Sequence, residues 1–129
     1  MPWKSTYGAQ GIELHFSERC DGHDLLAAHE SIYRHKYAEG LHYVIADFSC
    51  VEYLDLSFAD LLRIAEHDRQ YLLRNPAHLL VMVAPQAPVL GWLRTYERYM
   101  EGSNLRTAIT HTRSEALAWL HSEMLDPVA

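Results

Sequence analysis

Two short runs of apolar, β-forming residues constrain what this chain can fold into. They are Leu41–Phe48 and Leu79–Ala84, and glycine, aspartate or proline bounds each of them. Runs of this length without polar alternation are typical of strands that are covered on both faces, as in a sheet flanked by helices. We therefore predict two buried strands, with residues 41–48 in the centre of the sheet.

Helical patterns precede and follow these strands. Four stretches repeat apolar residues at spacings of three and four, which places those residues on one face of a helix. Ser57 is the natural N-cap of the second stretch, and Thr112 with Glu115 matches a capping box at the start of the fourth. In chain order the four stretches are 21–40, which stops at Gly40, 57–75, which stops before Pro76, 89–102 and 112–124. The apolar and aromatic stripe of the first stretch consists of Leu25, Leu26, His29, Ile32, Tyr33 and Tyr37.

Two weaker strands complete the pattern. Gly11–Ser17 alternates apolar and polar residues with a period of two, as a half-buried or edge strand does, and Leu105–Thr110 predicts a brief strand. Strand and helix alternate along the chain, which indicates an α/β fold with a mostly parallel or mixed sheet of about four to five strands. We expect one domain over residues 1–129, with sites in the loops 49–57 and 85–88 beyond the carboxyl ends of strands.

The charge of the chain argues against several classes of partner. Its 129 residues carry a net charge of −6, whereas nucleic acids and anionic membranes are recognised by clustered Lys and Arg. The first residues lack the apolar core of a signal peptide, and no apolar stretch approaches the ~20 residues of a membrane span. We expect a cytoplasmic protein with reduced thiols at Cys20 and Cys50, the latter buried or half-buried and inert.

The sequence lacks the motifs of common enzymes. It has no Gly-x-Ser-x-Gly elbow, no glycine-rich phosphate loop and no signature of a catalytic cysteine. Nine histidines invite a metal hypothesis, but no two of them have the i, i+4 spacing that aligns two ligands on a helix. We therefore predict no catalytic residue, no metal site and no cofactor.

The segment that leaves the central strand resembles a known family. Residues 44–57 read Val-Ile-Ala-Asp-Phe-Ser-Cys-Val-Glu-Tyr-Leu-Asp-Leu-Ser, which is similar to the signature of STAS domains of the anti-sigma-factor antagonist (SpoIIAA-like) group. In that signature a central strand runs into Asp-Leu-Ser-x-Val-x-x-Ile/Met-Asp-Ser-Ser-Gly and then a helix. Thr112–Leu120 looks like the last helix of compact bacterial members, which are related in fold to the CRAL-TRIO lipid carriers. The resemblance implies a STAS/SpoIIAA-like fold and a binding role without a reaction.

The same resemblance directs attention to one serine. In STAS regulators the phosphorylated serine directly follows the second aspartate; Leu56 occupies that position here, Ser57 keeps the next serine, and Phe58 replaces the glycine. The most economical interpretation of Ser57 is an N-cap, whose hydroxyl accepts a backbone N–H of the following helix. Phosphorylation of Ser57 is the alternative, since the positive end of the helix dipole attracts a phosphate, although Asp55 and Asp60 repel it.

These observations define a candidate binding surface. Its residues are Asp47, Ser49, Tyr53, Asp55, Ser57 and Phe58. The third helix adds Trp92, Tyr96, Tyr99 and Met100, which are either core residues or the border of a contact surface, with Tyr99 off the main stripe. We expect a non-enzymatic regulatory or protein-interaction module that binds a protein partner or a second copy as a homodimer. The alternative is a carrier or sensor of a small apolar ligand, such as a fatty acyl chain, held between the sheet and the helices 58–74 and 89–101.

Overall fold

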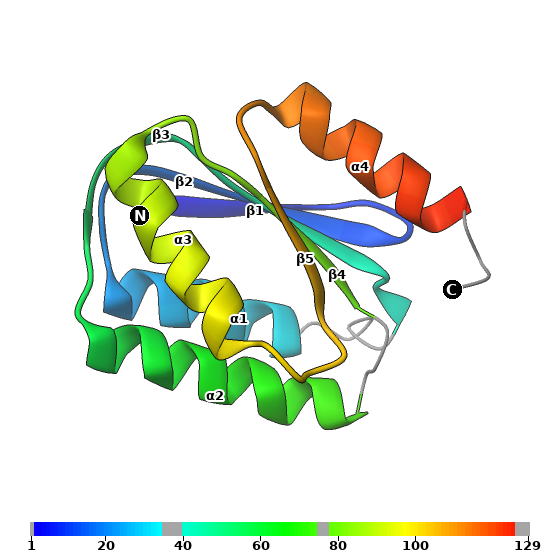
Figure 1. Ribbon diagram of the computed structural model, residues 1–129, viewed down its shortest axis with the longest axis horizontal. Helices are drawn as coiled ribbons and strands as arrows, with labels where there is room; N and C mark the ends of the chain where they lie inside the picture. Colours follow the sequence, from blue (N-terminus) through cyan, green and yellow to red (C-terminus); the bar gives the residue numbers. More distant parts are fainter. Residues whose placement is uncertain (1, 35–39, 75–77, 126–129) are drawn as a thin grey trace.

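The structure is a computed structural model, and it describes residues 2–34, 40–74 and 78–125. Within these ranges the chain forms five strands and four helices (Figure 1). The strands are β1 (Trp3–Tyr7), β2 (Gly11–Asp21), β3 (Tyr43–Asp55), β4 (Leu79–Val83) and β5 (Arg106–Thr110). The helices are α1 (Gly22–Arg34), α2 (Phe58–Arg74), α3 (Ala87–Tyr99) and α4 (Arg113–Leu125).

The order of strands in the sheet follows their order in the chain, β1-β2-β3-β4-β5. β1 pairs antiparallel with β2, and every later pairing is parallel. One helix joins each parallel pair, and right-handed crossovers that step in one direction place their helices on the same face. α1, α2 and α3 accordingly pack on one face of the sheet, whereas α4 covers the other (Figure 1). The predicted α/β fold with a mixed sheet is confirmed.

β3 lies in the middle of the sheet, and its side chains alternate between two cores. Val44, Ala46 and Phe48 enter the larger core beneath α1, α2 and α3, and Phe48 stacks on Phe16 of β2 with ring centroids 4.7 Å apart. Ile45 points the other way, into the smaller core beneath α4. The predicted central strand, covered on both faces, is confirmed.

The sequence did not reveal β1, and this omission affects β2. β1 pairs along its whole length with β2, so β2 has a neighbour on each side and is not an edge strand. Its alternation arises because Ile12, Leu14 and Phe16 enter the larger core, while Glu13 and His15 lie half-buried on the other face. All the side chains of β1 are half-buried or exposed, and its sequence Trp-Lys-Ser-Thr-Tyr contains no apolar run. The local sequence pattern therefore could not identify this strand.

The predicted loop 49–57 is wrong over most of its length. β3 continues to Asp55, because β2 continues to Asp21 and remains its partner after β4 has ended at Val83. We call the paired strand ends 17–21 and 50–55 the ribbon. Two register shifts, each with an extra residue on β3, interrupt the pairing near its start and within it. These bulges break the alternation of polar and apolar residues, so the sequence resembled a loop.

The predicted loop 85–88 is also shorter than expected, because α3 begins at Ala87. Gln86 precedes the helix, and its Nε2 donates to the main-chain oxygens of Ser49, at 3.1 Å, and Val51, at 3.2 Å. These two carbonyls lie on the part of β3 that extends past the end of β4. The Gln86 side chain thus takes the place that a longer β4 would fill.

The remaining helix predictions agree with the structure where it describes them. α2 begins after Ser57 and α4 after Thr112, as their capping residues predict. α1 is described to Arg34, and the predicted Tyr37 lies outside the described residues, as does the predicted stop at Asn75-Pro76. None of the described helices has the length and apolar character that a membrane crossing requires.

Candidate functional site

The six candidate binding residues divide into two groups. Asp47 and Ser49 belong to a polar network on the α4 side of the sheet. Tyr53, Asp55, Ser57 and Phe58 are exposed and lie where the ribbon passes into α2. The structure therefore does not bring the six residues into one continuous site.

Ser57 is the N-cap of α2, as predicted. Its Oγ accepts the backbone N–H of Asp60 at 3.1 Å, and its own backbone N–H donates to Oδ2 of Asp60, also at 3.1 Å. This reciprocal pair satisfies two backbone donors that the first turn of a helix would otherwise leave without partners. The hydroxyl of Ser57 therefore has a structural partner already.

α1 begins with the same device, made from two aspartates. The backbone N–H of Asp24 donates to Oδ1 of Asp21 at 2.9 Å, and the N–H of Asp21 donates to Oδ2 of Asp24 at 3.0 Å. The hydrogen bond from the Asp24 backbone holds the pKa of Asp21 below its ordinary value, because it stabilises the carboxylate. Both helices therefore start with a carboxylate at their positive end.

The two helix starts lie side by side. Asp21 and Asp55 are paired at the end of the ribbon. A Cβ atom on Gly22 would come within 2.4 Å of Cγ of Asp60, so only glycine allows the first turn of α1 to approach α2 this closely. We call residues 18–24 and 52–60 the acidic end; they include the carboxylates Glu18, Asp21, Asp24, Glu52, Asp55 and Asp60.

Large apolar side chains are exposed next to the acidic end. Phe58 is 63% exposed, and its ring lies 5.2 Å from the ring of Trp92 on α3. Leu62, one turn further along the same face of α2, is 52% exposed. We call Phe58, Leu62 and the half-buried Trp92 the apolar patch. Tyr53 is 51% exposed but has a different neighbour, the guanidinium of Arg19 at 4.8 Å from its ring centre.

Most of the aromatic stripe on α3 is core. Tyr96 and Met100 are buried, and Tyr99 is half-buried against the same core. Arg69 of α2 donates to the main-chain oxygens of Tyr99 and Glu101, so the end of α3 is attached to α2. Of the four residues predicted on this helix, Trp92 is the one that contributes to the apolar patch.

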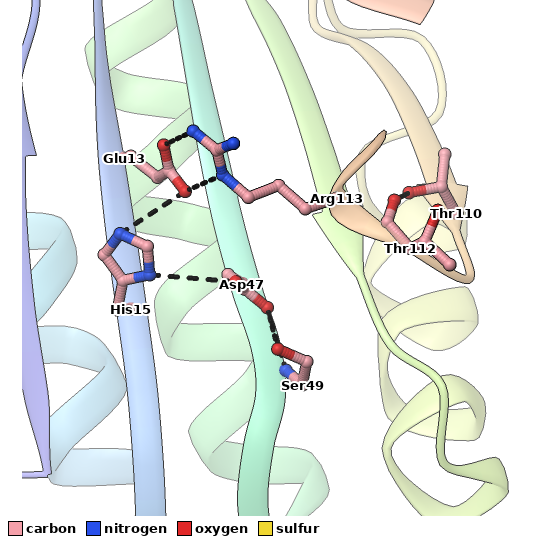
Figure 2. A network of polar contacts seen from close by, with 7 residues as sticks. All are labelled: Glu13, His15, Asp47, Ser49, Thr110, Thr112 and Arg113. Carbon is pink, nitrogen blue, oxygen red and sulfur yellow. Dashed lines mark hydrogen bonds and ion pairs between the residues drawn. The ribbon is translucent and has the colours of Figure 1, made fainter. Parts of the chain in front are cut away.

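Figure 2 shows the polar network on the other face of the sheet. Arg113, the first residue of α4, donates from Nε and an Nη atom to the two oxygens of Glu13 at 2.6 and 2.8 Å. His15 lies between two carboxylates, 3.3 Å from Glu13 and 3.7 Å from Asp47. Ser49 donates from its backbone N–H and its hydroxyl to the same oxygen of Asp47, at 2.9 and 2.6 Å. The network attaches the start of α4 to β2 and β3.

Glu13 and Arg113 neutralise each other in this polar network. The hydrogen bond from Arg113 holds the pKa of Glu13 below its ordinary value, and the same contact raises the pKa of Arg113. Glu13, His15 and Asp47 are the described residues that could hold a metal ion, because one ligand atom from each lies within 4.8 Å of the others. However, Arg113 already neutralises Glu13. This pairing makes Glu13 a weaker metal ligand, and the absence of a metal site stays a prediction.

Sequence reasoning missed this network because its residues come from different elements. The signal that could have revealed it is the register of β2 against β3, which places His15 opposite Asp47. A cleft of about 340 Å³ opens beside it, lined by Trp3, Lys4, His15, Phe16, Ser17, Asp47, Ser49 and Cys50. Both cysteines are free, as expected, but Cys50 is exposed and the prediction of a buried or half-buried thiol is wrong.

A second polar group lies buried in the larger core. Asp68 of α2 accepts hydrogen bonds from Tyr96 of α3 and from Nδ1 of His29 of α1, the latter at 2.9 Å. Burial alone would lower the pKa of His29, but the charge and hydrogen bond of Asp68 outweigh it and raise that pKa. Burial and the same carboxylate raise the pKa of Tyr96. Asp68 therefore connects three helices.

The cavity beside this group is small. Its volume is about 70 Å³, and its walls are mainly apolar side chains of the sheet and of α1, α2 and α3. Ligand sites for drug-sized molecules usually measure about 300–1,000 Å³. The cavity therefore does not support the alternative of a fatty acyl carrier.

Comparisons with known proteins identify the fold. No protein-family model matches the chain, and no curated protein matches it. The solved structure of the anti-sigma factor antagonist SpoIIAA in its unphosphorylated form gives a TM-score of 0.58 at 12% identity and covers 92% of this chain and 97% of that chain. SpoIIAA, the Bacillus cell fate determinant, in its phosphorylated form gives 0.55 at 12% identity and covers 92% and 98%. The chain therefore has the SpoIIAA fold, as the resemblance of residues 44–57 predicted.

Proposed function

We propose that this protein is a non-enzymatic regulatory module that binds a protein partner through the apolar patch and the adjoining acidic end. The observation that carries the proposal is that the side chain of Phe58, which directly follows the N-cap Ser57, is 63% exposed. Fully burying a side chain of this kind is worth about 1.5–3 kcal/mol. A partner that covers Phe58 and Leu62 gains this free energy, which the isolated chain leaves unused.

The position of the patch supports a contact surface. Phe58 of α2 lies against Trp92 of α3 and one helical turn from Leu62, whereas scattered single apolar residues on a surface need no explanation. Leu73 is an example of the latter, 78% exposed near the other end of α2. The shared fold adds an analogy, because SpoIIAA is an anti-sigma factor antagonist and so a regulator.

The polar groups support binding rather than catalysis. The hydroxyls of Ser49 and Ser57 are used within the fold, one as a donor to Asp47 and the other as an acceptor at the helix start. Each ring nitrogen of His15 faces a carboxylate, so neither is directed at a hydroxyl or thiol that it could activate.

Capture of partners by the tagged protein in its native cells tests the proposal. The wild type and the variants Phe58→Asp and Leu62→Asp are compared after crosslinking, with Leu73→Asp as a control on the same helix. We expect a reproducible partner that both patch variants lose and the control retains. A dimer that Phe58→Asp dissociates would identify a second copy as the partner. A set of captured proteins that is the same for all four chains would contradict the proposal.

A further inference from the structure

We infer that the partner presents basic side chains around an apolar anchor, and that the acidic end receives the basic groups while the apolar patch receives the anchor. This inference rests on the proposed function and specifies the chemistry of the partner. It goes beyond the fold, because it depends on where this chain places its own charges.

The acidic end holds almost all of the net charge of the protein. It contains six of the seventeen carboxylates of the sequence and one of its eleven Lys and Arg residues, Arg19. The rest of the chain then has eleven carboxylates and ten basic residues, which nearly balance, against a total net charge of −6. A surface with such an excess of one sign attracts the opposite sign over several ångströms and accelerates association.

The contacts bring four of these carboxylates together, and Asp24 shares backbone hydrogen bonds with Asp21. Asp21 and Asp55 are neighbours in the ribbon, and Asp60 lies against the start of α1. The positive ends of α1 and α2, which could otherwise attract an anion, already have Asp24 and Asp60 as capping carboxylates. The one guanidinium of the acidic end lies over the ring of Tyr53. This surface therefore favours a cationic partner.

The apolar patch supplies the second half of the recognition. Phe58 lies within residues 52–60 between Ser57 and Asp60, so the patch adjoins the acidic end, and Trp92 extends it onto α3. Charges at the rim steer the approach and select the partner, whereas a desolvated apolar anchor supplies most of the affinity. Nucleic acids and anionic membranes would be repelled by the same carboxylates, which leaves a protein with Lys or Arg around a large apolar side chain.

Binding of defined peptides tests this inference on the full chain. The probes are a synthetic helical peptide of Lys and Leu, a matched peptide of Glu and Leu, and a peptide of Lys and Ser that lacks the anchor. NMR spectra of the labelled protein report which amides shift. We expect the Lys–Leu peptide to shift residues 18–24, 52–62 and Trp92, and to bind more tightly than the other two. Its affinity should fall when salt rises from about 0.1 to about 1 M, which shortens the Debye length from about 10 to about 3 Å.

Two charge reversals provide the matched control. Asp55→Lys and Glu101→Lys change the net charge equally at exposed positions, the first in the acidic end and the second after α3. We expect Asp55→Lys to weaken binding of the Lys–Leu peptide roughly fivefold more than Glu101→Lys does. Thermal unfolding of both variants verifies that each is folded. Equal affinities for the two variants, shifts over other elements, or equal binding of the Glu–Leu or Lys–Ser peptide would overturn the inference.

The partner captured from cells separates this inference from the proposed function. If Phe58→Asp abolishes capture and Asp55→Lys leaves it unchanged, the contact surface stands and the basic character of the partner is refuted. If Phe58→Asp leaves capture unchanged, the proposed function fails, whatever the peptides show. Loss of capture in both variants, with Glu101→Lys unaffected, supports both.

Discussion

At the scale of single residues, the hydroxyl of Ser57 can be interpreted as a helix N-cap or as a phosphorylation site. In the sequence it stands one residue after the position that is phosphorylated in STAS regulators, and in the structure it caps α2 through Asp60. We predict that Ser57→Ala lowers the free energy of unfolding by about 1 kcal/mol, while Ser57→Asp retains most of it because aspartate also caps helices. Urea denaturation measures both values.

The partner captured from cells then decides whether Ser57 also regulates. A phosphate on Ser57 would join the six carboxylates of the acidic end, at a helix start that is already capped. We therefore predict that Ser57→Asp changes capture no more than Ser57→Ala does. Loss of the partner in the aspartate variant alone would instead support phosphorylation as a switch.

His78 is a residue whose burial has a consequence for stability. It is 6% exposed at the entrance to β4, and burial lowers its pKa to about 4, with nearby charges as smaller influences. A folded-state pKa below the ordinary value of 6.5 means that folding disfavours the charged form. The neutral form of His78 therefore contributes its full share to the free energy of unfolding above about pH 6.5, and this share is lost as the pH falls towards about 4.

The pH dependence of a variant tests this. We predict that the free energy of unfolding of the wild type falls more steeply between about pH 6.5 and 4 than that of His78→Gln, by up to about 3 kcal/mol. The same replacement at the exposed His111 is the matched control for the change of residue type. Parallel curves for the wild type and His78→Gln would contradict the assignment.

At the scale of elements, the ribbon stands out because a side chain replaces a neighbouring strand along one of its edges. Beyond the end of β4, β3 pairs with β2 on one side, and on the other it accepts two hydrogen bonds from Gln86. We predict that Gln86→Ala destabilises the ribbon by about 1–2 kcal/mol, since the partly buried hydrogen bond to Val51 and the exposed one to Ser49 are both lost. Hydrogen exchange should accelerate at the amides of residues 50–55 and not in β4 or β5. Gln70→Ala, which removes an exposed contact with Glu66, serves as the control and should change neither.

The elements also show which parts of the fold a sequence pattern can reveal. Val44–Ala46 and Leu79–Val83 were recognisable because a strand segment covered on both faces is apolar at successive positions. Ser57, Thr112 and Glu115 mark helix starts by their own chemistry. The ribbon was not recognisable, because its two bulges destroy the period of two on which strand prediction depends.

At the scale of the whole molecule, long-range pairing determines what the sequence could not show. The polar network exists because β2 and β3 pair in one register, which brings His15 to Asp47, and because α4 returns across the sheet to place Arg113 beside Glu13. Neither relation follows from local spacing. The same long-range pairing separates the six predicted site residues into two groups. Asp47 and Ser49 lie on the α4 side of the sheet, whereas Ser57 and Phe58 lie beyond the ribbon at the start of α2.

The fold and the surface of the molecule carry different information. Two SpoIIAA structures share the fold at 12% identity, so the arrangement of sheet and helices persists with very different side chains. The apolar patch and the acidic end belong to this chain, and the proposed function and the class of partner depend on them.

The most direct test of the central claim is hydrogen–deuterium exchange of the protein with and without its captured partner. If the apolar patch is the contact surface, protection should be greatest in residues 52–62 and around Trp92, while α4 and β1 exchange as in the free protein. Protection concentrated on α4 or β1, with residues 52–62 unchanged, would contradict the account.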